Sequence, residues 1–286
     1  MDKTALCPEY AGEGAKIASA CRNPSIPQKA DKISPIKEET VWPHAAEIPF
    51  CSRRRPSWRR PLAACFDALS ADNFFGQSSW EAAEKELALQ TARLCLKKAQ
   101  TTPEKVSLVL AGDLQAQCTA SSYAMRELGI PFAGLFGACS TMAEALGLGA
   151  ALCSAGMADG LRQFRTPLSY GAVRTPTAQW TATAAGACLL RPAGEGVQLC
   201  AVTFGRVQDY KIKDINNMGA AMAPAAAATL LHYLKDTGSA PEDFDRIYTG
   251  DLGHVGSQLL RDLLAAEGLL LKNHVDCGCI LYDATE

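Results

Sequence analysis

The sequence lacks any large excess of charge of one sign. Its 28 Lys and Arg residues against 30 Asp and Glu residues leave a formal net charge of -2 at pH 7. A nearly neutral chain has no overall attraction to nucleic acids or to anionic lipid, so any such contact would have to be local. The sequence also lacks a Gly-x-Gly-x-x-Gly or Walker phosphate loop. We therefore predict no nucleic-acid partner, no nucleotide site and no cofactor.

The sequence has 12 cysteines, and its start lacks the apolar region of a secretory signal. Cysteines in a chain of this kind are typical of reduced thiols in a cytosolic-type compartment, so we expect no structural disulfides.

Residues 129–158 contain Glu144 as their only charged side chain and are long enough to span a bilayer. Pro131, several glycines and the carboxylate of Glu144 instead favour a buried helix, and no transmembrane span is predicted.

Residues 1–61 differ in composition from the rest of the chain. They are rich in Pro and Lys without sustained periodicity, and the stretch SRRRPSWRR (52–60) is a dense basic cluster. Such a composition favours a divergent, poorly ordered arm. A phosphate-contacting patch is the less favoured alternative, because a short basic run specifies no partner by itself.

From residue 62 onward the pattern is regular, and it repeats. An amphipathic helix with a Ser79 cap (78–100) precedes a turn and an apolar strand ending at Gly-Asp-Leu (101–114). The same order recurs at 223–238 and 239–252, followed by a closing helix at 256–269. Units of this kind build mostly parallel sheets covered by helices. We predict a layered α/β/α/β/α fold made of two pseudo-symmetric halves, 62–190 and 191–286.

The motifs carry a resemblance to a known family. FFGQSSWEAAE (74–84), LAGDL (110–114), IPFAGLFGACST (130–141), GAAMAPAAAATL (219–230) and YTGDLGHVGS (248–257) resemble the stage V sporulation protein AD family, which has a thiolase-like fold. The resemblance implies non-enzymatic binding of dipicolinic acid (pyridine-2,6-dicarboxylate), including its calcium complex, for its uptake into and release from endospores. It also implies the other membrane proteins of the stage V sporulation A operon as partners, a homodimer, and a place on the cytoplasmic side or at the periphery of the spore inner membrane.

The chain departs from this family at two further points. Between Gly160 and Leu161 the sequence lacks a further strand that the family carries at this point. The chain also stops at Glu286, before the family's closing strands. We therefore expect the second half of the thiolase-like fold to be incomplete.

Cys139 lies between an apolar strand-like run and a small-residue helix expected at about 140–155. A thiol at a helix N-terminus is suited to nucleophilic catalysis, as in thiolases and ketoacyl synthases. The corresponding turn of the second half reads Gly250-Asp251 where ketoacyl synthases carry His-Gln, and His254 lies beyond it. We therefore favour Cys139 as a wall of a pocket facing Asp251, with its helix packed against the helix at 219–230; an acyltransferase using Cys139 as nucleophile is the alternative.

A site for a planar dianion needs paired donors, helix N-terminal N–H groups and an apolar face. Asp113 and Asp251, at equivalent strand ends, are expected to cap helices, with calcium ligation as the alternative. The stretch HVDCGC (274–279) is poor evidence for zinc, and no metal site is predicted. The predicted ligand-binding residues are Cys139, Ser140, Thr141, Arg165, Tyr170, Arg174, Gln179, Asp113, Asp251 and His254.

Overall fold

A computed structural model gives the fold. It describes residues 40–42, 45–50, 66–70, 72, 74–114, 117–137, 140–155, 161–165, 183–194, 197–214 and 216–280. The helices are α3 (Trp80–Lys98), α4 (Thr119–Leu128), α5 (Thr141–Ser154), α6 (Met218–Thr237), α7 (Gly253–Ala266) and α8 (Cys277–Ile280). The strands are β1 (Thr40–Trp42), β2 (Ala45–Phe50), β3 (Val109–Ala111), β4 (Phe132–Gly134), β5 (Leu161–Arg165), β6 (Thr183–Cys188), β7 (Val197–Leu199), β8 (Ile247–Thr249) and β9 (His274–Asp276).

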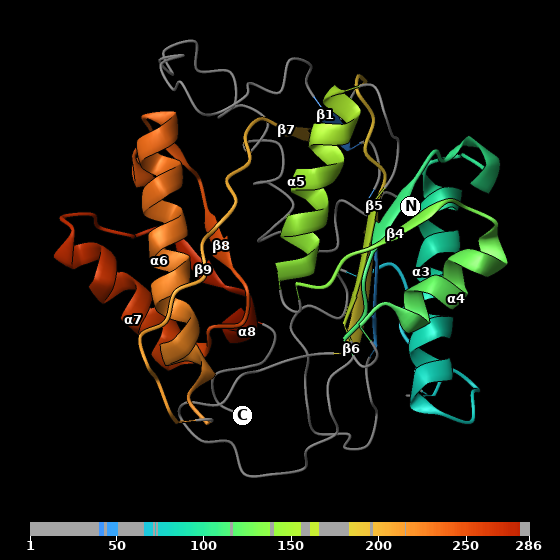
Figure 1. Cartoon of the computed structure of the whole chain (residues 1–286), viewed down its shortest axis with the longest axis horizontal. Coiled ribbons are helices and arrows are strands. Elements are labelled where there is room, and N and C mark those ends of the chain that lie inside the picture. Colours follow the sequence, from blue (N-terminus) through green and yellow to red (C-terminus); the bar gives the residue numbers. More distant parts are fainter. Residues whose placement is uncertain are drawn as a thin grey trace.

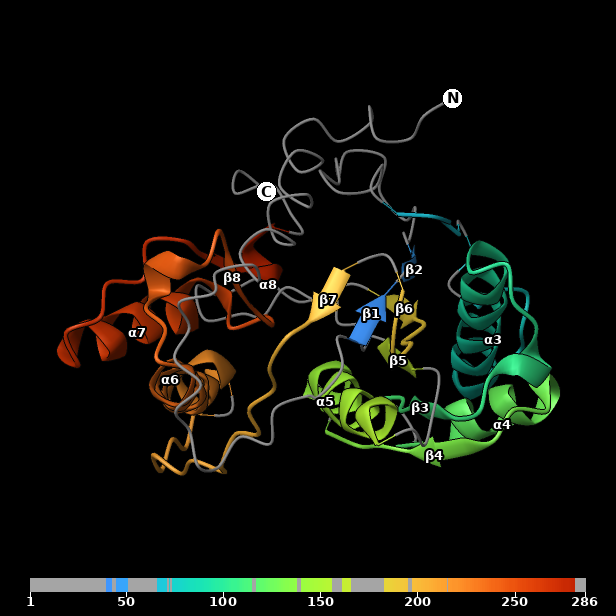
Figure 2. The same ribbon diagram turned by 90° about the horizontal axis from the view of Figure 1, so that it is seen from above.

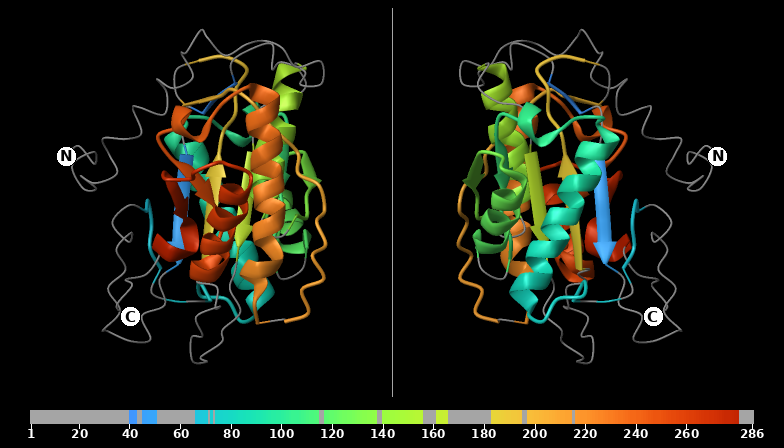
Figure 3. Two further views of the ribbon diagram at one scale, coloured as in Figure 1. Left: turned by 90° about the vertical axis from the view of Figure 1, so that its left-hand side faces the viewer. Right: turned by 90° about the vertical axis from the view of Figure 1, so that its right-hand side faces the viewer.

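The elements form layers, as the sequence predicts. In Figures 1 and 2, α3 and α4 lie on one outer side and α6 and α7 on the opposite outer side, with the strands, α5 and α8 between them. The two side views of Figure 3 show α6 in front on one side and α3 in front on the other. This is an α/β/α/β/α arrangement.

The internal duplication is confirmed element by element. In the first half α3, a short 3-10 turn at Pro103–Lys105, β3, α4, β4 and α5 follow one another. In the second half α6, a 3-10 turn at Pro241–Asp243, β8, α7, β9 and α8 follow in the same order. β3 pairs parallel with β4, and β8 pairs parallel with β9. By this order the counterpart of α5 is α8, and the counterpart of α6 is α3.

The β3 strand of the first half is buried on both faces. On β3, Val109 and Ala111 face the core shared with α3 and α4, whereas Leu110 belongs to the core under α5. This alternation is the period-two pattern of a strand covered by helices on both sides. β1, β2, β5, β6 and β7 form antiparallel pairs, so the described sheets are not mostly parallel as the sequence predicts.

The α3 helix shows how closely the local sequence sets an element. Ser79 is its N-cap, as predicted, and the Ser79 hydroxyl oxygen accepts the N–H of Ala82 at 3.2 Å. Glu81 in the first turn and Lys97 and Lys98 in the last turn complement the helix dipole.

Part of the arm expected to be poorly ordered forms strands. β1 pairs antiparallel with β7, and β2 pairs antiparallel with β6. Pro49 lies in β2, an edge strand, where a missing backbone N–H costs least. Pairing with distant strands gives these short runs a partner that composition alone does not reveal. The rest of the 1–61 arm lies outside the described residues.

The buried helix predicted at 140–155 is α5, and its Thr141, Ala145 and Cys153 are buried. Its expected direct packing against the helix at 219–230 is not what the structure shows. Val202 and Phe204 lie against Gly147 of α5, and Gly205 lies against Thr229 of α6. The chain segment 202–205 therefore runs between the two helices.

Two expectations from composition meet different outcomes. Among the described residues, no helix combines the length and the apolarity that crossing a membrane requires. Cys200, however, is disulfide-bonded, so the expectation of no disulfides is wrong at that position. The other described cysteines are reduced thiols.

Candidate functional site

Two buried carboxylates lie at the C-terminal end of β3 in the first half. Asp113, directly after β3, is buried, and its Oδ2 accepts the N–H of Ser121 in the first turn of α4 at 2.9 Å. This is the capping role predicted for Asp113. Glu84 of α3 is also buried, and its Oε1 accepts the N–H of Leu114 at 3.2 Å. Both carboxylates fix the loop that leaves β3.

The start of α5 is tied to the end of β4 by hydroxyl groups. The Gly137 N–H donates to Thr141 Oγ1 at 3.0 Å, and the Ser140 hydroxyl donates to the Gly137 carbonyl at 2.7 Å. The structure thus brings Asp113, Ser140 and Thr141 to the same end of the first half. Cys139, Tyr170, Arg174 and Gln179 lie outside the described residues, and of Arg165 only the backbone, in β5, is described.

Cys118, which sequence reasoning did not single out, lies at this end as well. Its thiol donates to the Leu135 carbonyl at 3.4 Å. Burial, followed by the negative charges of Asp113 and Glu144, raises the pKa of the Cys118 thiol. A thiol held in its neutral form is a poor nucleophile. The first-half end is therefore acidic in character, with Asp113 and Glu144 both close enough to Cys118 to affect its thiol.

In the second half, the corresponding place is the C-terminal end of β8 and β9. Asp251, after β8, is buried, and a methyl group built on Gly278 would come within 2.0 Å of its Oδ1. Only a glycine leaves room for α8 to begin this close to the carboxylate. Asp276, the last residue of β9, is also buried and accepts three hydrogen bonds: from Leu252 N–H at 2.8 Å, Thr249 Oγ1 at 3.0 Å and Cys279 N–H at 3.1 Å.

A chain of polar contacts leads from Asp276 to Arg261. His274 Nε2 lies 2.9 Å from Thr249 Oγ1, and His274 Nδ1 lies 3.3 Å from Ser257 Oγ. Arg261 donates from Nη1 to Ser257 Oγ at 3.1 Å. Because Thr249 gives its proton to Asp276, its oxygen must accept from His274 Nε2–H. His274 Nδ1 is then the acceptor for the Ser257 hydroxyl, so this network holds His274 neutral.

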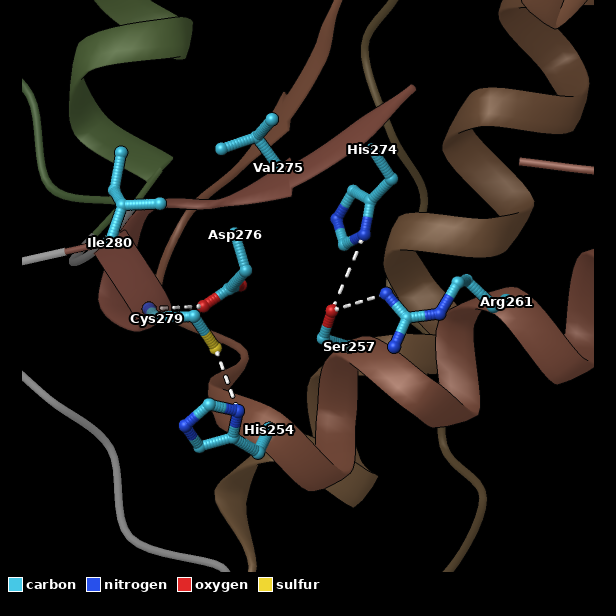
Figure 4. A pocket seen from close by; sticks show the side chains of 8 residues that line it. All are labelled: His254, Ser257, Arg261, His274, Val275, Asp276, Cys279 and Ile280. Carbon is cyan, nitrogen blue, oxygen red and sulfur yellow. Dashed lines mark hydrogen bonds between the residues drawn. The ribbon is translucent and has the colours of Figure 1, made fainter. Parts of the chain in front are cut away.

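These side chains line a pocket of about 290 Å³ between α7, β9 and α8. Figure 4 shows Arg261 and Ser257 toward one end of it and His254 with Cys279 toward the other. Val275 and Ile280 add apolar surface. Of the predicted residues whose side chains the structure describes, only His254 lines this pocket. Ser257, Arg261, His274, Asp276 and Cys279 were missed; the HVDCGC stretch contains the last three of them, but we judged it only as a possible zinc site.

The Cys279 thiol is strongly held in its neutral form. Its Sγ lies 3.5 Å from His254 Nδ1. Burial first, and then the nearby carboxylates of Asp276 and Asp251, raise the pKa of Cys279 to about 12. Within the described part of the chain, no group of three or more His, Cys, Asp or Glu side chains is arranged to hold a metal ion. The pocket thus combines neutral polar groups, the Arg261 guanidinium and the buried carboxylate of Asp276.

The buried His274 makes the stability of the second half pH-dependent. Burial, and next the positive charge of Arg261, lower the pKa of His274 below its usual 6.5, with Asp276 opposing. As pH falls below about 6.5, the unfolded chain takes up a proton before the folded chain does, so stability must fall. We expect the urea midpoint to decrease between about pH 7.5 and 5.5 and this slope to be smaller in His274→Gln. An equal slope in both proteins would contradict the assignment.

The fold is that of thiolase-like ketosynthases. The structure is similar to cerulenin-bound OleA of Xanthomonas campestris, with a TM-score of 0.58 and 12% identity over 86% of this chain and 84% of that one. It is also similar to 3-oxoacyl-(acyl carrier protein) synthase III of Pseudomonas aeruginosa PAO1, with a TM-score of 0.55 and 17% identity over 83% and 82% of the two chains. At such identities the likeness defines the fold alone.

The sequence comparisons define the family. The family model for Stage V sporulation protein AD (SpoVAD) matches residues 58–286. Stage V sporulation protein AD of Bacillus subtilis (strain 168) is 37% identical over 235 residues, which cover 78% of this chain and 70% of that protein. The chain belongs to the stage V sporulation protein AD family and is a sporulation protein with a thiolase-like fold, as the motifs predict.

Proposed function

We propose that this chain binds dipicolinic acid without forming a covalent intermediate, and that this binding serves the uptake of dipicolinic acid into endospores and its release from them. We extend the proposal to the calcium complex of the ligand, to a homodimer as the binding unit, and to membrane proteins of the same sporulation operon as partners. Their place would be the cytoplasmic side or the periphery of the spore inner membrane.

The observation that supports binding over acyl transfer is Asp251. Acyl transfer needs a base near the nucleophile, and a histidine at this strand end would supply it. Here the turn after β8 presents a buried aspartate packed against Gly278. The nearby His254 lies against the Cys279 thiol. A carboxylate in this position can shape a cavity, but it is a weaker base than histidine at neutral pH.

Isothermal titration calorimetry tests the proposal. Purified protein is titrated with dipicolinate, with and without calcium, and with pyridine-2-carboxylate, which lacks one of the two carboxylates. We expect saturable binding of dipicolinate and markedly weaker binding of the monocarboxylate, because a dianion gains a second charge-assisted contact. Absence of heat at millimolar dipicolinate in both buffers would overturn the proposal.

The competing acyltransferase hypothesis makes Cys139 a nucleophile. If Cys139 only shapes the protein, Cys139→Ser is expected to bind dipicolinate within about threefold of the wild type, a change of less than 1 kcal/mol. Cerulenin or an acyl-CoA should leave the intact protein unmodified by mass spectrometry. Modification at Cys139, together with loss of function in Cys139→Ser, would establish acyl transfer instead.

A further inference from the structure

The pocket between α7, β9 and α8 holds two opposite charges. Its lining includes the Arg261 guanidinium, on α7, and the carboxylate of Asp276, at the end of β9. Figure 4 shows Arg261 on one side of the pocket and Asp276 beside Cys279 on the other. Neither ion pair found among the described residues involves these groups. Arg261 and Asp276 therefore line one pocket without pairing with each other.

Three neutral side chains connect the two charged groups. Thr249 donates to Asp276 Oδ2 at 3.0 Å and lies 2.9 Å from His274 Nε2. His274 Nδ1 lies 3.3 Å from Ser257 Oγ, to which Arg261 donates from Nη1 at 3.1 Å. The guanidinium and the carboxylate cannot move together without breaking this chain of contacts. Charges that are held apart in this way are preorganised, which lowers the entropic cost of binding a ligand between them.

Both charged groups have capacity for a further hydrogen bond. Besides its bond to Ser257, Arg261 donates only from Nη2 to Gln258 Oε1, at 2.9 Å, which leaves donors among its five N–H groups. Asp276 accepts from two backbone N–H groups and one hydroxyl, whereas an ionised carboxylate has about four acceptor positions. The Cys279 thiol, a weak donor beside Asp276, lies 3.5 Å from His254 Nδ1 and can donate there instead.

The two ends of the pocket attract ligand groups of opposite charge. Burial first, and then the negative charges of Asp276 and Asp251, raise the pKa of the Cys279 thiol, so the potential at this end is negative. The Arg261 end is positive. A dianion would be repelled at the Asp276 end, and a simple cation would be repelled at the Arg261 end. A ligand that carries one charge of each sign gains at both ends.

We propose that this pocket binds a free amino acid in its zwitterionic form, with the carboxylate on Arg261 and the ammonium group on Asp276. Both contacts are charge-assisted hydrogen bonds. Val275 and Ile280 provide apolar surface for the side chain, and a volume of about 290 Å³ lies at the small end of the range for ligand sites, which suits a single amino acid. The inference is independent of the proposed function, because dipicolinate carries two negative charges and no ammonium group.

Titration calorimetry of the full chain with L-valine tests this inference. We expect saturable binding with a Kd of about 1 mM or tighter. N-acetyl-L-valine lacks the ammonium charge and L-valinamide lacks the carboxylate, so each should bind at least about tenfold more weakly than L-valine. Absence of saturable binding up to about 20 mM L-valine would overturn the inference, and so would equal binding of either analogue.

Variants of Arg261 locate the site. Arg261→Ala is expected to weaken L-valine binding by about tenfold or more, and Arg261→Lys, which loses the planar fork, by about threefold to tenfold. Arg261→Ala should not weaken the binding of L-valinamide, because that ligand has no carboxylate to lose; a loss caused by altered structure alone would affect both ligands. Arg126→Ala, on α4 and outside the pocket, is the matched control and should bind L-valine within about twofold of the wild type.

Circular dichroism and the urea midpoint first establish that each variant is folded, and Arg261→Lys provides the answer if Arg261→Ala is not. If the folded Arg261 variants bind L-valine as tightly as the wild type, the assignment to this pocket is wrong.

Discussion

Replacing Asp276 with alanine is expected to lower the free energy of unfolding by about 3 to 5 kcal/mol. The buried carboxylate accepts hydrogen bonds from the backbone of Leu252 and Cys279 and from the Thr249 hydroxyl. The alanine variant loses all three, and the buried Leu252 N–H keeps only its contact with the Gly250 carbonyl oxygen at 2.8 Å. Because these contacts join the turn after β8 to the start of α8, we expect the loss to affect the whole second half.

Urea denaturation followed by circular dichroism measures this effect. Asp276→Asn keeps one acceptor oxygen and should lose about half as much stability as the alanine variant. Asp262→Ala is the matched control, since Asp262 is an exposed residue of α7 that only accepts from Gln258, and its effect should stay within about 0.5 kcal/mol. An Asp276→Ala protein as stable as the control would show that the network around β9 contributes little.

The second large effect is expected at the crossing of α6 and α7. A methyl group built on Gly256 would meet three backbone atoms of Gly219, namely Cα at 2.7 Å and the carbonyl carbon and oxygen at 3.0 Å. Backbone atoms cannot rotate away as a flexible side chain can, so the two helices must separate. Gly256→Ala is therefore expected to destabilise the protein by about 1 to 3 kcal/mol, despite the higher helix propensity of alanine.

The same denaturation experiment tests this contact. Gly219→Ala should have a comparable effect, because its methyl group would come within 2.3 Å of the Leu252 carbonyl oxygen. Gly250→Ala is the control, since nothing lies within 4 Å of the added methyl group. Equal stability of Gly256→Ala and Gly250→Ala would mean that α6 and α7 lie further apart than described.

The sequence alone determined the repeated helices and strands of the two halves. Ser79 and the charges of the first and last turns define α3 locally. The apolar runs that follow the turns at Pro103 and Pro241 define β3 and β8. These signals depend on neighbours within a few residues, which is why they can be read without a fold. The equivalent Gly-Asp-Leu segments then place Asp113 and Asp251 at matching strand ends, and the capping role of Asp113 follows from its position before α4.

Tertiary structure alone decided which distant residues meet. The parallel pairing of β8 with β9 brings His274 and Asp276 beside Thr249, and the packing of α7 brings Ser257 and Arg261 to the same place. No local pattern marks these residues, because hydrogen bonds between segments about 20 residues apart depend on register and not on composition. For the same reason β1 and β2 were not anticipated: a short strand is stable only when a distant partner supplies its hydrogen bonds.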